Sequence, residues 1–231
     1  MITFNFKYAI FDFDGVVADT ENVFAQFDCD LLNAILKKAG KPPSLTPKDI
    51  RVLAGNTGEN KLNLIAKEHN FSPEIYKEEF LNNRAKERTT LFKTYTVSLG
   101  KNLRPFLDQH TGKCALATNK IAKKLHNDMA LMEIDHLFDI KITSDPPMRK
   151  KPEPDMLLEA AEKLQAKPSE CIYIGDNTLD MLAAQNAGMI PVGFIIEGKN
   201  NHEDRAKDLK KHGATLIIDD FHELTPYFTS S

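Results

Sequence analysis

The residues with the clearest potential for chemistry follow a short apolar run near the amino end of the chain. Residues 8–11 are Tyr-Ala-Ile-Phe, and Asp12, Phe13, Asp14 and Gly15 come directly after them. An apolar run that ends in two carboxylates is typical of a buried strand that stops at an active-site loop, because ligands collect beyond the carboxyl ends of parallel strands. Two aspartates there repel each other and are poorly solvated, so the pattern predicts a cation between them. Oxygen ligands suit Mg²⁺, the first aspartate can be a nucleophile, and the second can shuttle a proton.

This motif alone has other interpretations. Aspartate and glycine are ordinary turn residues, so a simple turn remains open. A calcium loop of the EF-hand type requires a glutamate about eleven residues after its first aspartate. Val23 occupies that place after Asp12, which excludes the calcium loop. The catalytic interpretation therefore depends on the segments downstream.

Two later segments carry groups that can bind an anion. Thr118 and Asn119 follow the apolar run 114–117 and precede a predicted helix. A hydroxyl and an amide beside a helix N-terminus can hold an anion, although both residue types are also common caps. Lys151 stands beside the first of two closely spaced prolines, which stiffen the backbone and would hold its ammonium in place. The alternative for this lysine is an exposed basic turn.

A final segment supplies more carboxylates. Asp176 follows the apolar run 171–174, and Asp180 comes four residues later, one helical turn away on the same side. Both can serve a metal, and helix capping by Asp176 or Asn177 is the alternative. The four segments together offer a carboxylate nucleophile, a hydroxyl, a lysine and an acidic pair. This set suits phosphoryl transfer, in which positioning and charge neutralisation carry most of the catalysis.

Strand-like and helical stretches alternate along most of the chain. This alternation predicts an α/β fold, a mostly parallel sheet with helices on both faces. The predicted strands are 8–11, 114–117, 139–143, 171–174, 190–194 and 215–218, and the helices between them are 120–131, 154–164, 179–187 and 203–212.

The stretch from Thr20 to Arg88 breaks the alternation because it contains no convincing strand. Its candidate helices are 21–38, 46–53, 59–69 and 73–88, with Thr46-Pro47 and Ser72-Pro73 as pairs of N-cap and first helical residue. We therefore expect a core domain made of 1–19 and 91–231, and a small all-helical cap domain over 20–90.

Composition limits the class of protein. The chain has 231 residues, 42% hydrophobic and 27% charged, and a formal net charge of −3, so no global basic field attracts nucleic acid or an anionic membrane. No apolar run approaches the roughly 20 residues that span a bilayer, and residues 1–7 do not resemble a signal peptide. We expect a cytoplasmic location, and the three cysteines argue against a disulfide framework.

With these motifs in this order, the chain resembles the haloacid dehalogenase-like hydrolase superfamily over nearly its whole length. Its motifs are most similar to those of the phosphoglycolate phosphatase and β-phosphoglucomutase-type subfamily. The resemblance implies a Rossmann-like core with a helical cap, and it assigns a role to each motif residue. Asp12 would be the nucleophile, Asp14 the acid and base, Asp176 and Asp180 the further acids of the Mg²⁺ site, and Thr118, Asn119 and Lys151 the ligands of the phosphoryl group.

The same resemblance implies a function. We expect Mg²⁺-dependent hydrolysis of a small phosphorylated metabolite, of the phosphoglycolate or sugar phosphate class, through an aspartyl-phosphate. Mg²⁺ would be held by Asp12, Asp176 and the backbone carbonyl of Asp14. The cap would exclude water and contact the substrate, with Arg51, Asn56 and Lys61 as candidates, although a solvated helix face is the alternative for each. We expect no nucleic acid or membrane partner, and a monomer or weak homodimer.

Three alternatives remain beside this expectation. A sugar phosphate mutase uses the same core and differs in returning the phosphoryl group to a sugar. A signalling receiver domain is disfavoured, because its acceptor aspartate lies mid-domain in a chain of about half this length. A non-catalytic metabolite-binding protein on the same fold would show no Mg²⁺-dependent release of phosphate from an aryl phosphate.

Overall fold

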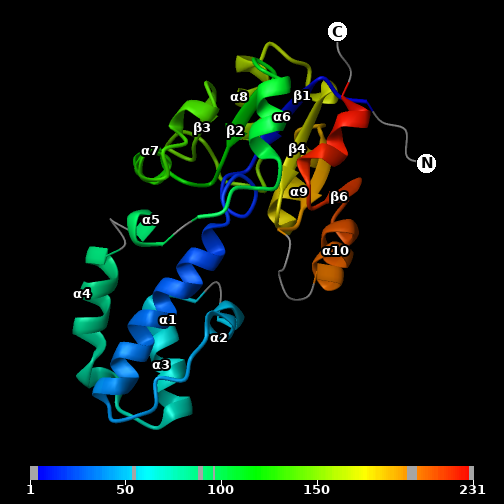
Figure 1. Cartoon of the computed structure of the whole chain (residues 1–231). Coiled ribbons are helices and arrows are strands. Elements are labelled where there is room, and N and C mark those ends of the chain that lie inside the picture. Colours follow the sequence, from blue (N-terminus) through cyan, green and yellow to red (C-terminus); the bar gives the residue numbers. More distant parts are fainter. Residues whose placement is uncertain (1–4, 54–55, 88–90, 96, 197–201, 229–231) are drawn as a thin grey trace. The chain divides into compact units, whose positions relative to one another are not determined.

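The computed structural model describes residues 5–53, 56–87, 91–95, 97–196 and 202–228. The chain divides into two compact units, one formed by Met1–Asp19 with Ser98–Ser231 and the other by Thr20–Val97 (Figure 1). The helical unit ends at Val97, whereas the sequence predicted that it ends at residue 90. The extension arises because helix α5 (Leu91–Thr94) packs on the first helix of that unit, where Phe24 and Phe92 have ring centroids 6.0 Å apart.

The first unit is built on a parallel sheet. Its described strands are β1 (Tyr8–Phe11), β2 (Cys114–Ala117), β3 (Lys141–Ile142), β4 (Cys171–Gly175), β5 (Ile190–Phe194) and β6 (Leu216–Ile218), in the order β3-β2-β1-β4-β5-β6. The predicted parallel α/β fold is thereby confirmed. The strand expected over 139–143 shrinks to two residues, because β3 lies at the sheet edge and pairs with β2 over only two positions.

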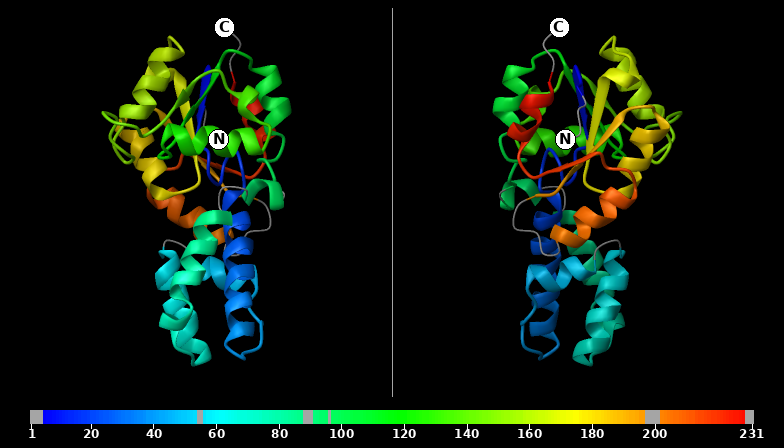
Figure 2. Two further views of the ribbon diagram at one scale, coloured as in Figure 1. Left: turned by 90° about the vertical axis from the view of Figure 1, so that its left-hand side faces the viewer. Right: turned by 90° about the vertical axis from the view of Figure 1, so that its right-hand side faces the viewer.

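Helices cover both faces of this sheet (Figure 2). On one face, α8 (Asp155–Lys163) and α9 (Thr178–Asn186) bury an apolar cluster that includes Ile10 and Tyr173 of the strands. On the other, Phe106 of α6 (Leu103–Gln109) and Phe221 of the 3-10 helix η5 (Phe221–Tyr227) lie 6.1 and 5.5 Å from the ring of Phe11 in β1. Each fully buried side chain of this size contributes about 1.5–3 kcal/mol, so both faces anchor the central strand β1.

Other helices complete the first unit. They are α7 (Ala122–Leu131), α10 (His202–Lys211), and the 3-10 helices η3 (Asp135–Leu137) and η4 (Pro168–Glu170). Helix α7 begins two residues later than expected, because Ile121 has the extended backbone of an N-cap residue.

The second unit is all-helical and has its own core. Its elements are α1 (Thr20–Lys38), α2 (Pro47–Val52), α3 (Gly58–His69), the 3-10 helix η1 (Pro73–Ile75), α4 (Lys77–Glu87) and α5. Cys29, Leu32 and Leu36 recur on one face of α1 and are buried against the other helices. The helix expected over 73–88 is divided between η1 and α4, and Tyr76, with φ −113° and ψ −7°, caps the end of η1 between them. Among the described residues, no helix has the length and apolarity needed to cross a bilayer.

Candidate active site

The order of the strands explains why distant motifs meet. The central strand β1 pairs with β2 on one side and β4 on the other, and Phe11 is in register with both Leu116 and Ile174. The residues that follow the three strands therefore emerge at one edge of the sheet. This is the point where the strand order reverses, and open parallel sheets bind their ligands there. The fold thus brings Asp12, Thr118 and Asp176 to one place.

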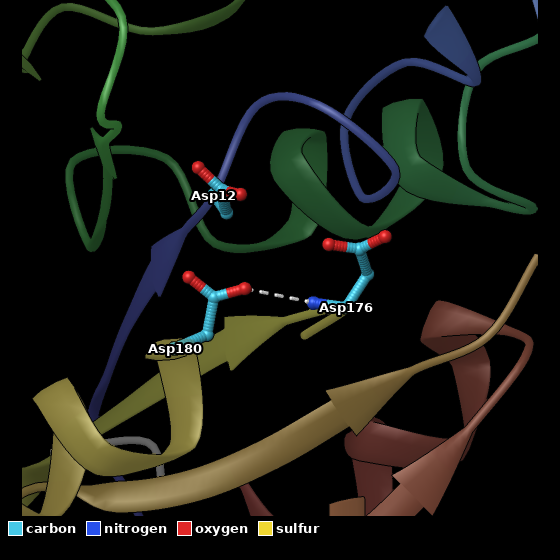
Figure 3. Close-up of side chains that lie close together, drawn as sticks. All are labelled: Asp12, Asp176 and Asp180. Atoms are coloured by element: carbon cyan, nitrogen blue, oxygen red, sulfur yellow. Dashed lines mark hydrogen bonds between the residues drawn. The ribbon is translucent and has the colours of Figure 1, made fainter. Parts of the chain in front are cut away.

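Three carboxylates converge at this edge (Figure 3). One side-chain oxygen each from Asp12, Asp176 and Asp180 lies within 4.8 Å of the others, and all three residues are buried. Oδ1 of Asp12 is buried and accepts no hydrogen bond from the described residues. Burial raises the pKa of Asp12 to about 6; Lys151 opposes this rise and the charge of Asp180 adds to it. A hard divalent cation would satisfy such a set of crowded oxygens, so these residues fit Mg²⁺.

Two glycines allow the carboxylates to approach the backbone. Gly15 has φ +77°, and a Cβ at that position would lie 2.2 Å from Oδ2 of Asp176. A Cβ on Gly175 would lie 2.2 Å from the Cβ of Asp180. Because real side chains do not tolerate such distances, glycine is required at both positions for the acidic cluster to form.

Lys151 contacts two of the three carboxylates, those of Asp12 and Asp180. Its Nζ donates hydrogen bonds to Oδ1 of Asp180 at 2.7 Å and to the hydroxyl of Tyr173 at 2.8 Å. It also lies 2.9 Å from Oδ1 of Asp12, as an ion pair without hydrogen-bond alignment. Burial alone would lower the pKa of Lys151, but Asp12 and Asp180 outweigh it and raise that pKa well above its ordinary value. The lysine is therefore a fixed ammonium, as the two prolines after it suggested.

The position of Lys151 depends on two further side chains. The Tyr173 hydroxyl, which accepts from Lys151, donates to the carbonyl of Ala117 at 2.8 Å, so it connects β4 to β2 across β1. Oδ1 of Asn119 accepts a hydrogen bond from the backbone N–H of Lys151 at 2.9 Å. Asn119, expected as a phosphoryl ligand, thus also holds the lysine segment in place.

Asp180 and Asn177 combine capping with charge placement. Oδ1 of Asn177 accepts hydrogen bonds from the N–H groups of Leu179 and Asp180, so Asn177 is the N-cap of α9. Oδ2 of Asp180 in turn accepts from the N–H groups of Asp176 and Asn177, each at 3.1 Å. Both oxygens of Asp180 are engaged within the protein, whereas Asp176 does not cap the helix. Of the two capping candidates, the structure selects Asn177.

Asp14 lies apart from the three-carboxylate cluster. Its Oδ1 pairs with Nζ of Lys120 at 2.8 Å, and its side chain is 38% exposed. The carboxylate of Asp14 therefore does not share the space between Asp12, Asp176 and Asp180. Thr118 is buried, and its Oγ1 accepts from the backbone N–H of Lys120 at 3.3 Å.

Three polar residues at the site were not among the residues predicted from the sequence. Lys120 follows Thr118-Asn119 directly, so its place next to a motif was an available signal. Tyr173 was visible as a lone hydroxyl inside an apolar strand. Arg205 of α10 donates to the backbone carbonyl of Asp176 at 2.9 Å and to its Oδ2 at 3.0 Å. It stands 29 residues from Asp176 in a strongly polar helix, and no local pattern marks it.

The cap candidates lie in the helical unit. Arg51 hydrogen-bonds Asn22, and the amide of exposed Asn56 donates to the carbonyl of Leu53 at 3.3 Å. Lys61 is buried and pairs with Asp28 at 2.7 Å, where Arg84 also binds. Although burial opposes the ionisation of Asp28, hydrogen bonds from Arg84 and Lys61 hold its pKa below the ordinary value. The ammonium of Lys61 is therefore engaged within the core of its own unit.

Comparisons with known proteins agree with this geometry. Residues 9–194 match the family model described as haloacid dehalogenase-like hydrolase. A phosphoglycolate phosphatase of Psychrobacter arcticus is 30% identical over 230 residues, which cover 94% of this chain and 94% of the relative. The pyrophosphatase PpaX of Bacillus cereus is 26% identical over 227 residues, 96% of this chain and 95% of the relative.

Among solved structures, a HAD family hydrolase from Deinococcus radiodurans with bound phosphate and sodium has the same fold. The TM-score is 0.76 at 23% sequence identity, and the match covers 95% of this chain and 93% of the other.

Proposed function

This chain belongs to the haloacid dehalogenase-like hydrolase family and is a phosphatase, and we propose that it hydrolyses a small phosphorylated metabolite with the help of Mg²⁺. The observation that carries the proposal is the buried cluster of Asp12, Asp176 and Asp180 at the carboxyl ends of β1 and β4, with Lys151 paired to Asp12 and Asp180. The similarity to a phosphoglycolate phosphatase supports the phosphoglycolate or sugar phosphate class of substrate.

Asp12 is the proposed nucleophile. Its carboxylate oxygen forms a bond to phosphorus as the bond between phosphorus and the leaving oxygen breaks, which gives an aspartyl-phosphate. The pKa of Asp12, raised to about 6 by burial, still leaves the carboxylate ionised at neutral pH. Lys151 pairs with both Asp12 and Asp180, so the charges beside Asp12 are already fixed in the folded protein. Asp12 therefore needs little reorganisation before it attacks phosphorus.

Asp14 is the proposed acid and base. Its proton passes to the leaving alkoxide oxygen, and the resulting carboxylate then takes a proton from the water that attacks phosphorus. That second attack breaks the bond to Asp12 and releases inorganic phosphate. The hydroxyl of Thr118, the amide of Asn119 and the ammonium of Lys151 are the groups proposed to bind the phosphoryl oxygens.

Asp12, Asp176 and the backbone carbonyl of Asp14 would hold Mg²⁺, with Asp180 in support through Lys151 and the backbone. When bound, Mg²⁺ supplies positive charge that offsets both the carboxylates and the phosphate dianion. Without that charge, the crowded carboxylates repel an anionic substrate.

A screen of phosphorylated metabolites, ranked by kcat/KM with Mg²⁺ and with excess chelator, tests the proposal. We expect phosphate release that depends on Mg²⁺ and disappears in Asp12→Asn, whose amide is nearly isosteric but a poor nucleophile. Product analysis distinguishes free phosphate from the isomerised sugar phosphate that a mutase would form. Full activity in chelator, or normal turnover of folded Asp12→Asn, would contradict the mechanism.

A further inference from the structure

Lys120 connects the proposed acid and base to the body of the first unit. Its Nζ lies 2.8 Å from Oδ1 of Asp14 and 2.7 Å from Oδ2 of Asp128 on α7. It also lies 4.4 Å from the centroid of the Phe13 ring. The side chain of Lys120 is only 10% exposed and that of Asp128 is 14% exposed, so these contacts differ from an ordinary surface ion pair.

Because Asp14 is partly exposed, its ion pair with Lys120 can determine the orientation of its carboxylate. The Asp14 side chain is 38% exposed, in contrast to the buried Asp12 two residues earlier. Gly15 follows with a positive φ, so the chain turns away directly after Asp14. A half-exposed carboxylate on a turn has several accessible rotamers. The charge-assisted hydrogen bond from a nearly buried ammonium selects among them.

The pairing of Lys120 with Asp128, in addition to Asp14, limits the roles that its ammonium can have. Asp128 and Asp14 share one ammonium, so its positive charge is balanced within the protein. Lys151, by contrast, lies among the carboxylates at the phosphoryl site. Lys120 is therefore poorly placed to act as a second charge for the phosphate dianion, and well placed to orient a carboxylate.

We propose that Lys120 is the positioning residue for Asp14, and that Asp128 and the Phe13 ring hold Lys120 in place for that task. The proposal rests on the function proposed above, in which Asp14 delivers a proton to the leaving oxygen. A misplaced Asp14 slows departure of a poor leaving group and has little effect on a good one. The substrates that depend on Lys120 are accordingly alkyl phosphates, whose alkoxide must be protonated as it leaves.

Two substrates separate this role from a structural one. We expect Lys120→Met to lower kcat/KM for an alkyl phosphate by roughly 10–100-fold, part of the typical contribution of a general acid. For p-nitrophenyl phosphate, whose leaving group needs little protonation, the loss should stay within about 3-fold. The ratio kcat/KM reports steps up to departure of the alcohol, so hydrolysis of the aspartyl-phosphate does not enter the comparison.

Three variants control for charge and folding. Lys123→Met removes a lysine from the exposed face of α7, and it should leave both substrates unchanged. Lys120→Arg keeps the charge and should restore part of the activity on the alkyl phosphate. Lys120→Gln retains a hydrogen-bond donor and replaces Lys120→Met if that variant does not fold, as judged by circular dichroism.

The outcomes are distinct. A fall in activity on the alkyl phosphate alone, partly restored by Lys120→Arg, supports the proposal. An equal fall on both substrates, or no fall on either, overturns it. Absence of phosphate release from both substrates by the native protein would overturn the proposed function itself, and the role of Lys120 with it.

Discussion

Replacing Asp12 by Asn should stabilise the metal-free protein while it abolishes turnover. Asp12 is buried beside Asp180, and burial is the main reason that its pKa rises from 3.8 to about 6. The ionised carboxylate is therefore an unfavourable group in the folded state when no metal is bound. The amide of asparagine has almost the same shape and cannot ionise, so the substitution removes this penalty.

The magnitude follows from the two pKa values. They differ by about 2, and at about 1.36 kcal/mol for each tenfold change in affinity for the proton, this corresponds to about 3 kcal/mol. The figure already includes the attraction of Lys151, which acts against the rise. For a chain of this size, about 3 kcal/mol corresponds to an increase in Tm of roughly 6–12 °C.

The dependence on pH has a definite sign. The folded state binds the Asp12 proton more tightly than the unfolded state, so stability from this group is present below about pH 4 and is lost as the pH rises to about 6. The advantage of Asp12→Asn should therefore be largest above pH 7. At pH 5, between the two pKa values, it should fall to about half.

Chemical denaturation in excess chelator at pH 7.5 and pH 5 measures both quantities. Asp204→Asn, at a carboxylate 76% exposed on α10, is the matched control and should change stability by less than about 0.5 kcal/mol. The reasoning fails if Asp12→Asn unfolds at lower denaturant than the native protein at pH 7.5. It also fails if the advantage of the variant does not shrink at pH 5.

Three further outcomes are expected. Lys151→Met should destabilise the protein by about 3–5 kcal/mol in chelator, because it leaves buried carboxylates uncompensated, and adding Asp12→Asn should recover part of that loss in the same denaturation assay. Millimolar Mg²⁺ should raise the Tm of the native protein, and Asp176→Asn should lose most of that rise in a thermal shift measurement, whereas an equal rise in both would contradict the metal site. In the helical unit, Asp28→Asn should lower stability by about 3–5 kcal/mol, measured by urea unfolding, because it removes the buried anion between two cations; a change below about 1 kcal/mol would show that water already reaches this group.

The motifs could be recognised without the structure because each is local. An apolar run followed by Asp12, Thr118 or Asp176 marks a strand end, and the parallel alternation of strands and helices implies that strand ends share one edge of a sheet. The bounds of β1, β2 and β5 coincide with the predicted ranges, because each strand is a local apolar run in the sequence. Edge strand β3 was predicted too long, because its length depends on a partner far away in the sequence.

The partners of the charged side chains could not be deduced in this way. Lys61 was a candidate for substrate contact by its residue type, yet it pairs with Asp28, which is 33 residues away. Arg205 reaches Asp176 from α10, although nothing in that polar helix distinguishes it from a solvated cation. Such pairs depend on which helices pack together and on how deeply each group is buried.

The chemical groups available at the sheet edge could be recognised from residue types alone: two aspartates after β1, a hydroxyl after β2, a stiffened lysine, and an acidic pair after β4. Residue type and spacing along a single strand or turn are sufficient for that. How the charges are paired depends on the folded packing, which places Lys151 beside Asp12 and Asp180, and Lys120 between Asp14 and Asp128. The reason is physical, because the energy of a charge depends on its distance to other charges and on its exclusion from water. Both quantities are set by the packing of the folded chain, which brings together segments as distant as those of Asp14 and Lys120, 106 residues apart.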